Sequence, residues 1–403
     1  MTSDKKAILL IIDGLGDLPT PKTPLQTAKK PNLDKLAKDG ITGLMSTIGR
    51  GIVPGSDTGH LQLLGYEPRE YYHGRGPLEA LGAGIALRNG DIAFRANFAT
   101  AKGNNIVDRR AGRLETTIAK RLESVLNFEI EDVQCIFKST VEHRGVLVLR
   151  GKGLSANISE TDPHKNDHIL ESKPLDDSKE AKKTAAVVNA FTRSARDHLH
   201  VHEDNRKREK TGKPEANAVL LRGAGAYVKV PTITERFGIT ATCVAGGALY
   251  KGVAKYIGMS VLNVDGATGT ADTNLKEKGK ATVNALRGND LVFLHVKGCD
   301  SFGHDGDFNG KTKMIERIDA ELIPIIAKSG ANLIITGDHS TPCIIKGHSG
   351  HEVPILIHGN ERADEVKTFD EQSCMGGGLG HINGKDIMPI ILNLIGKAKK
   401  YGS

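Results

Sequence analysis

The chain has 403 residues, of which 38% are hydrophobic, 26% are charged and 47 are glycine, and its formal net charge is +7. This composition is ordinary for a soluble α/β protein and excludes a disordered or fibrous chain, while the length at roughly 150 residues per domain favours two domains. No apolar run reaches the ~20 residues of a membrane helix, and the apolar stretch near the N-terminus is too short for a signal peptide, so we expect a cytoplasmic protein with no membrane partner.

Three short apolar runs are predicted to be strands of one parallel sheet. They are residues 7–13 (AILLIID), 291–300 (LVFLHVKGCD) and 331–339 (ANLIITGDH), and each ends at or near an aspartate. Continuous runs of Ile, Leu and Val closed by a polar residue or glycine are typical of strands buried on both faces. Residues 310–330 have the apolar spacing of a helix and complete a β-α-β unit with the last two runs.

A serine stands just ahead of an apolar, helix-like stretch in residues 53–66, VPGSDTGHLQLLGY. Capping of that helix is the default interpretation of Ser56, because serine is favoured at this position. The alternative is a nucleophile, since first-turn N–H groups and the helix dipole favour an anion such as phosphate. The sequence G-S-D-T-G also differs from the G-x-S-x-G of serine hydrolases, which favours phosphoryl transfer over acyl transfer.

The sequence changes in character between about residues 82 and 180, where alternating residues and turn signals indicate antiparallel strands. A polar helical segment at 177–198 is expected to return the chain to the first sheet. We therefore predict an α/β fold with two domains. Residues 1–81 and 181–403 would form a catalytic metal-binding domain, and residues 82–180 an inserted α+β domain that binds substrate or acts as a lid.

Aspartates and histidines gather where the buried runs end. They are Asp13, Asp300 and His304 in DSFGH, Asp338 and His339 in GDHS, and His348 and His351 in GHSGHEVP. Taken singly, each fits a turn or a structural role. Taken together they favour a metal site, because the carboxyl ends of parallel strands converge at one edge and unpaired buried carboxylates are costly. Oxygen and imidazole ligands suit Mn²⁺, Zn²⁺, Co²⁺ or Mg²⁺, and metals near Ser56 would stabilise its alkoxide without a His–Asp triad.

Nine segments, in order, resemble the cofactor-independent (2,3-bisphosphoglycerate-independent) phosphoglycerate mutases of archaeal type, in the alkaline phosphatase superfamily. These are IIDGLGD, VPGSDTGHLQLLGY, GRGPLEALGAGI, FRANFAT, DRRAGR, TDPH, CDSFGHDGD, TGDHSTP and HSGHEVP. The resemblance implies an alkaline-phosphatase-like, mostly parallel sheet flanked by helices, with a smaller inserted domain. It also implies an isomerase of glycolysis and gluconeogenesis that interconverts 3-phosphoglycerate and 2-phosphoglycerate through a phosphoserine at Ser56.

The resemblance further implies two divalent metal ions, with Mn²⁺ expected and Mg²⁺, Co²⁺ and Zn²⁺ as the alternatives. By the family pattern one ion would be held by Asp13, Ser56, Asp338 and His339. The other would be held by Asp300, His304 and His348. We choose His348 over its rival His351 because the family spacing H-S/T-x-x-x-V-P favours the earlier histidine.

The substrate is expected to be held by arginines of the inserted domain, because guanidinium groups bind carboxylate and phosphate bidentately. The candidates are Arg109, Arg110, Arg144 and Arg95, and for each a surface salt bridge is the alternative. Lys251, in GGALYKG, resembles a family lysine that neutralises phosphate. The acid or base for the glycerate hydroxyl is sought among Asp108, Asp162 and His164, with Asp108 assigned to catalysis and the other two to substrate binding. Hinge closure is expected around residues 76–84 and 178–190.

Two other functions remain open. A metal-dependent phosphatase or another phosphomutase of the superfamily would use the same residues, although an arginine-rich lid favours retention of a phosphorylated acid. A non-catalytic basic protein could instead bind nucleic acid and use metals structurally, but the positive charges are dispersed and few aromatic residues are present, so no nucleic-acid partner is expected. The five scattered cysteines contain no CxxC pair and are expected to be reduced, which disfavours a disulfide framework and a zinc-thiolate site.

Overall fold

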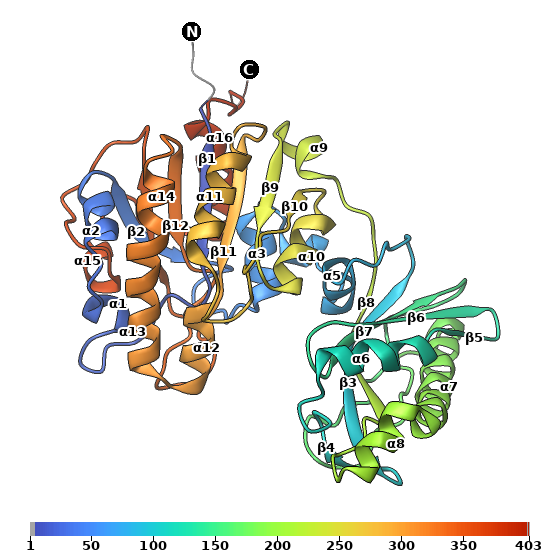
Figure 1. Cartoon of the computed structure of the whole chain (residues 1–403). Coiled ribbons are helices and arrows are strands. Elements are labelled where there is room, and N and C mark those ends of the chain that lie inside the picture. Colours follow the sequence, from blue (N-terminus) through green and yellow to red (C-terminus); the bar gives the residue numbers. More distant parts are fainter. Residues whose placement is uncertain (1–4, 401, 403) are drawn as a thin grey trace. The chain divides into compact units, whose positions relative to one another are not determined.

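The computed structural model describes residues 5–400 and 402, which form two compact units (Figure 1). The first unit contains the chain up to Tyr72 and from Val230 onward, and the second contains His73–Lys229. The second unit therefore starts before the expected boundary at residue 82 and continues past the expected boundary at residue 180. The reason is that the long helix after residue 178 and the strand after residue 217 pack within the second unit.

The first unit is built on an eight-stranded sheet with the order β10-β9-β11-β1-β12-β13-β2-β14. Among the described strands of this sheet, β13 alone runs opposite to the others, so the sheet is mostly parallel as predicted. The strands are β1 (Ala7–Ile12), β2 (Ile41–Ser46), β9 (Ala241–Val244), β10 (Ser260–Leu262), β11 (Leu291–Val296), β12 (Asn332–Thr336), β13 (Val353–His358) and β14 (Gly380–Asn383).

Helices flank this sheet (Figure 1). They are α1 (Pro24–Thr27), α2 (Pro31–Lys38), α3 (Ser56–Leu63), α4 (Pro68–Tyr71), α9 (Ile233–Phe237), α10 (Ala248–Tyr256), α11 (Leu275–Ala285), α12 (Gly298–Asp305), α13 (Phe308–Arg317), α14 (Ile323–Ala327), α15 (Glu371–Cys374) and α16 (Ile387–Leu394). The helix predicted at 310–330 is present as α13 and α14 joined by the π-helical turn Ile318–Leu322. Alternate residues of β1 (Ile8, Leu10 and Ile12) share one core with apolar residues of α13 and α14.

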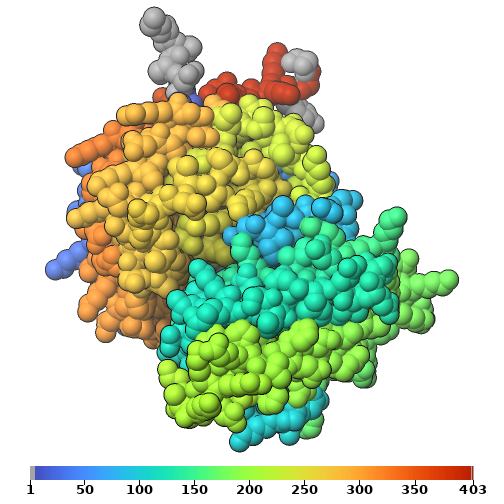
Figure 2. Space-filling view, turned by 45° about the vertical axis from the view of Figure 1, so that its right-hand side comes forward, coloured from blue at the N-terminus to red at the C-terminus, as the bar shows by residue number. Residues whose placement is uncertain are grey.

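The second unit is an α+β fold around an antiparallel six-stranded sheet. Its elements are α5 (Arg75–Gly82), β3 (Ile92–Lys102), β4 (Asn105–Asp108), α6 (Thr116–Leu122), the 3₁₀ turn Glu123–Val125, β5 (Phe128–Ile130), β6 (Val133–Ser139), β7 (Arg144–Arg150), α7 (Lys179–Val201), α8 (Glu203–Lys210) and β8 (Ala218–Ala226). Figure 2 shows the teal segment that contains α6 lying beside the yellow-green segment that contains α8, where Arg121 and Asp204 form an ion pair of 2.7 Å.

The chain passes between the units at Tyr72–His73 and at Lys229–Val230. The two hinge segments expected from the sequence lie elsewhere: residues 76–84 fall mostly in α5, and residues 178–190 fall in α7, a continuous helix of 23 residues. A continuous helix has no backbone position that absorbs a large rotation without breaking hydrogen bonds. The two chain crossings therefore lie outside the predicted hinge segments.

All five cysteines are buried and free of disulfide bonds, and the sequence predicted the second of these properties from their scattered spacing. Burial raises the pKa of each thiol to about 12. Within the described part of the chain, no helix combines the length and the apolar character that crossing a membrane requires.

Candidate metal centre

Three neighbouring parallel strands bring the predicted acidic residues to one edge of the first sheet. β1 is hydrogen-bonded to β11 on one side and to β12 on the other. Asp13 directly follows β1, Asp300 lies on α12 just after β11, and Asp338 and His339 follow β12. All four side chains are buried. The apolar runs therefore place these residues by ending at the same level of the sheet.

Ser56 is the first residue of α3, whose cap is the preceding Gly55. The capping interpretation of Ser56 is therefore wrong. The Ser56 side chain lies instead with its Oγ 3.2 Å from Nε2 of His339. A buried hydroxyl at a helix N-terminus and beside this histidine has the surroundings of a group that binds or attacks an anion.

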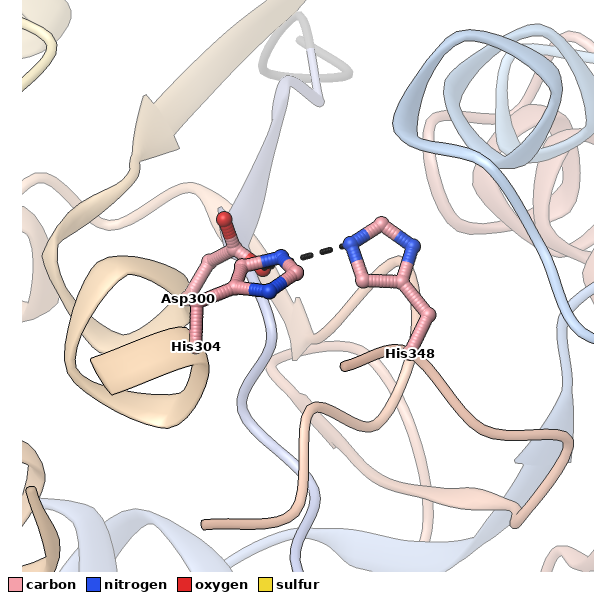
Figure 3. Close-up of side chains that lie close together, drawn as sticks. All are labelled: Asp300, His304 and His348. Carbon is pink, nitrogen blue, oxygen red and sulfur yellow. Dashed lines mark ion pairs between the residues drawn. The ribbon is translucent and has the colours of Figure 1, made fainter. Parts of the chain in front are cut away.

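Two groups of side chains present ligand atoms within 4.8 Å of one another. The first consists of Asp300, His304 and His348, and Figure 3 shows both imidazole rings turned toward the Asp300 carboxylate. Oδ1 of Asp300 is 3.4 Å from Nε2 of each histidine. The second group consists of Asp13, Asp300 and His339, so Asp300 belongs to both. Asp338 lies beside the second group, with its Oδ2 3.2 Å from Nε2 of His339.

Unsatisfied buried atoms show that this site fits a cation. Oδ1 of Asp13, Oδ2 of Asp338 and Nε2 of His60 are buried without a hydrogen-bond partner among the described residues. Burial and the nearby charges of Asp13 and Asp300 raise the pKa of Asp338 well above its usual range. Burial lowers the pKa of His339 to about 3, which leaves its imidazole neutral and able to bind a metal. A divalent ion would satisfy the free oxygen atoms and offset the clustered negative charge.

Three further side chains surround Asp13 and were missed by the sequence analysis. Tyr250 of α10 donates a hydrogen bond to Oδ2 of Asp13, and Nε2 of His295 lies 3.0 Å from the same oxygen. Lys297 places its Nζ 2.7 Å from Asp300 and 3.4 Å from Asp13. The HVKGCD segment that holds Asp300 also holds His295 and Lys297, so their spacing from that aspartate was the available signal. Tyr250 carried no comparable signal.

Close backbone packing holds the loops of the centre together. Gly14 has a φ of 66°, and a Cβ there would lie 2.7 Å from Oγ1 of Thr341 and 2.8 Å from Cα of Asp300. The N–H of Gly14 donates to Oδ1 of Asp338 at 3.2 Å. The Thr341 hydroxyl in turn lies 3.0 Å from Oδ1 of Asp300 and from Nδ1 of His339. Only glycine allows this approach, which explains the Asp-Gly pair after β1.

Arginines of the second unit gather near Asp162. Arg109 forms a two-pronged ion pair with Asp162, with distances of 2.7 and 2.9 Å from Nη2, and its Nη1 donates to the carbonyl of His164. Arg222 of β8 approaches the same carboxylate at 3.7 Å, and its Nε has no hydrogen-bond partner among the described residues. Arg222 could not be predicted as a site residue, because it follows the apolar run AVLL and resembles the end of an ordinary strand.

His143 feels the positive charges of Arg110, Arg144 and Arg222. Burial and then the positive charges of these arginines lower the pKa of His143 to about 4, although Glu142 acts in the opposite direction. Nδ1 of His143 is buried without a hydrogen-bond partner among the described residues. Positive charges near an unsatisfied polar atom suit an anionic ligand.

The remaining predicted residues have the following positions. Arg95 of β3 lies 3.5 Å from Glu79. The carboxylate of Asp108 accepts the N–H groups of Arg110 and Gly112 at 2.8 and 2.7 Å, and His164 is exposed beside Glu160. Lys251 lies on α10 next to Tyr250.

His351 is outside both ligand groups. It is exposed, and its Nδ1 lies 2.9 Å from Oγ of Ser349.

The fold and the site together define an α/β protein in which buried aspartate, histidine and serine side chains at the edge of a mostly parallel sheet fit a divalent metal centre. A family model described as "2,3-bisphosphoglycerate-independent phosphoglycerate mutase" matches residues 37–205. The chain is 47% identical to 2,3-bisphosphoglycerate-independent phosphoglycerate mutase 1 of Methanocaldococcus jannaschii, covering 99% of each chain. It is 46% identical to the protein of the same name from Archaeoglobus fulgidus, covering 98% of this chain and 99% of that one.

Solved structures agree with these relatives. A Pyrococcus horikoshii protein superposes with a TM-score of 0.87 at 37% identity, over 99% of this chain and 100% of that one. The cofactor-independent phosphoglycerate mutase of Thermoplasma acidophilum gives a TM-score of 0.72 at 36% identity, over 97% and 100%. The chain belongs to the 2,3-bisphosphoglycerate-independent phosphoglycerate mutase family.

Proposed function

We propose that this protein is a phosphoglycerate mutase, an isomerase that interconverts 3-phosphoglycerate and 2-phosphoglycerate by way of a phosphoserine at Ser56. The observation that carries the proposal is the buried Ser56 hydroxyl, which lies at the start of α3 and 3.2 Å from His339. Membership of the family is the reason for choosing phosphoglycerate as the substrate.

In the first half-reaction the Ser56 hydroxyl loses its proton and its oxygen attacks phosphorus, so a Ser56 O–P bond forms and the bond from phosphorus to the 3-oxygen of glycerate breaks. The released oxygen takes a proton. In the second half the 2-oxygen of the same glycerate loses its proton and attacks the phosphoserine, which restores the Ser56 hydroxyl. The phosphoryl group leaves and returns to the same glycerate molecule, so no outside phosphate donor is needed.

Two divalent ions, for which we propose Mn²⁺ with Mg²⁺, Co²⁺ and Zn²⁺ as alternatives, would supply charge for the Ser56 alkoxide and the transferring phosphoryl group. Asp13, Ser56, Asp338 and His339 would hold one ion. Asp300, His304 and His348 would hold the other. Lys297, whose side chain is 27% exposed beside Asp300, adds a fixed positive charge for the phosphate, and Lys251 is a second candidate for this role.

Arg109, Arg110, Arg144 and Arg222 would bind the carboxylate and phosphate of the substrate, with Arg95 as a further candidate. Asp162 fixes the Arg109 guanidinium through their two-pronged ion pair, and His164 adds its carbonyl. Asp108 is our candidate for proton transfer to and from glycerate, because two backbone N–H groups fix the orientation of its carboxylate.

The test is ³¹P NMR of 3-phosphoglycerate with metal-stripped protein, without 2,3-bisphosphoglycerate, before and after addition of Mn²⁺. We expect a 2-phosphoglycerate signal only with Mn²⁺, and a loss of about 10³-fold or more in the Ser56→Ala variant. Release of inorganic phosphate as the main product would instead indicate a phosphatase. No turnover with Mn²⁺ or the alternative metals would contradict both enzyme functions.

A further inference from the structure

A fully buried lysine lies behind the loops of the metal centre. Lys311 is in the first half of α13, and its side chain is 0% exposed. Its Nζ donates to the carbonyl of Gly16 at 3.0 Å, to the carbonyl of Thr341 at 3.0 Å and to Oδ2 of Asp17 at 2.8 Å. An ammonium group has three N–H donors, so these contacts use all of them. Lys311 therefore has no N–H group left for a substrate.

The three acceptors of Lys311 belong to two loops that carry three of the proposed metal ligands. Gly16 and Asp17 lie in the loop after β1, which begins with Asp13. Thr341 lies in the loop after β12, which also carries Asp338 and His339, and its hydroxyl contacts both His339 and Asp300. One buried ammonium group therefore bridges the two loops.

Other contacts also join the two loops, because β1 and β12 are paired strands and the N–H of Gly14 donates to Oδ1 of Asp338. The N–H of Thr341 donates to the carbonyl of Gly16 at 3.1 Å, and the Asp17 carboxylate accepts the N–H of Cys343 at 3.1 and 3.2 Å. Lys311 bonds to both of these acceptor residues and ties them to α13. Other α13 side chains at this depth, Met314 and Ile315, belong to the apolar core. Burial of a charge is costly where an apolar side chain would pack, so stability alone is a weak reason for a lysine here.

We propose that Lys311 is a positioning residue for the metal centre: its ammonium group sets the separation of the β1 and β12 loops, and through it the metal affinity of Asp13, Asp338 and His339. This inference rests on the proposed function because it requires these residues to bind metal. Removal of a group that supports metal ligands from behind typically weakens metal binding about 10–100-fold.

The experiment compares Mn²⁺ binding by calorimetry with thermal unfolding of the metal-free protein, for wild type, Lys311→Met and the double variant Lys311→Met/Asp17→Asn. The double variant removes the unpaired buried carboxylate that the single variant leaves. Lys30→Met is the matched control, because Lys30 is also a buried lysine, only 4% exposed, but it pairs with Asp34 in α2.

We expect a Kd for Mn²⁺ at least tenfold weaker in both Lys311 variants, a lower kcat and a nearly unchanged KM for 3-phosphoglycerate. The double variant recovers thermal stability but not metal affinity, and Lys30→Met binds Mn²⁺ as wild type does. Recovery of metal affinity together with stability in the double variant, or wild-type affinity in the single variant, would overturn the inference and leave the proposed function intact. Failure of the wild type to bind Mn²⁺ would overturn the metal centre itself and this inference with it.

Discussion

At the scale of single residues, two histidines three positions apart have different surroundings. The His348 ring stacks on the ring of His339 with centroids 3.6 Å apart, and its Nε2 is 3.4 Å from Asp300. His351 is exposed and contacts Ser349. Of the two histidines in GHSGHEVP, His348 therefore faces the metal centre and His351 does not.

This difference predicts that His348→Ala weakens Mn²⁺ binding at one site by at least about tenfold, because one ligand is lost, whereas His351→Ala leaves binding within about twofold. Titration of metal-stripped protein with MnCl₂, followed by calorimetry or by the EPR signal of free Mn²⁺, measures both. Equal losses in the two variants would contradict the assignment of His348.

The surroundings of His143 predict how the stability of the protein depends on pH. Its pKa is lowered from 6.5 to about 4 in the folded protein, chiefly by burial and then by Arg144. The unfolded chain therefore takes up a proton at a higher pH than the folded chain, so stability is full above pH 6.5 and falls as pH drops toward 4. The loss is about 3 kcal/mol at most, because solvent screens part of the arginine charge. In the His143→Asn variant, the free energy of unfolding measured with urea between pH 7 and pH 4 should lack this part of the decrease.

At the scale of elements, α12 carries two ligand candidates and approaches the β12 loop through a glycine. A Cβ on Gly303 would lie 2.4 Å from the carbonyl oxygen of Thr341 and 2.8 Å from Thr341 Cγ2. Nothing lies within 4 Å of a Cβ built on Gly347, in the segment before His348. Gly303 therefore permits close packing that a larger side chain would prevent, whereas Gly347 has room for a Cβ.

Gly303→Ala should therefore push α12 away from the loop, destabilise the protein by about 1–3 kcal/mol and weaken Mn²⁺ binding, whereas Gly347→Ala should change neither. Thermal unfolding and Mn²⁺ titration of the two variants check this. Wild-type stability and affinity in Gly303→Ala would mean that the contact relaxes without moving Asp300 and His304.

The strands of the first sheet could be predicted because β1, β11 and β12 are continuous apolar runs, and the helical spacing after residue 310 identified α13 and α14. The end of the inserted unit could not be predicted. β8 begins with AVLL, a run like that of β1, and an apolar run does not reveal which sheet it joins. Tyr250 and Arg222 were missed for a related reason, since only tertiary packing brings them to Asp13 and Asp162.

At the scale of the whole molecule, the inserted unit enters and leaves through neighbouring segments. A Cβ on Gly225, near the end of the unit, would lie 2.4 Å from the carbonyl oxygen of His73, at its beginning. The unit also has its own apolar core, with residues from β3, β6, β7, β8 and α7. A unit with adjacent ends and a separate core meets the conditions for independent folding.

We therefore expect a fragment of residues 73–229 to fold alone, with cooperative urea unfolding by circular dichroism and dispersed amide signals in NMR. A fragment of residues 82–180 lacks α5, β8 and nearly all of α7, so the central strand β3 loses a partner and this fragment should remain unfolded. A disordered 73–229 fragment would mean that the unit depends on the rest of the chain.

The burial of every native cysteine has a practical consequence for measuring motion. A thiol with a pKa of about 12 that is shielded from solvent reacts slowly with maleimides near neutral pH. Fluorescent dyes would therefore attach selectively to cysteines introduced at exposed positions, with all five native residues left in place. One such cysteine in each unit would give a donor and acceptor pair that reports, molecule by molecule, whether the distance between the units changes when phosphoglycerate is added.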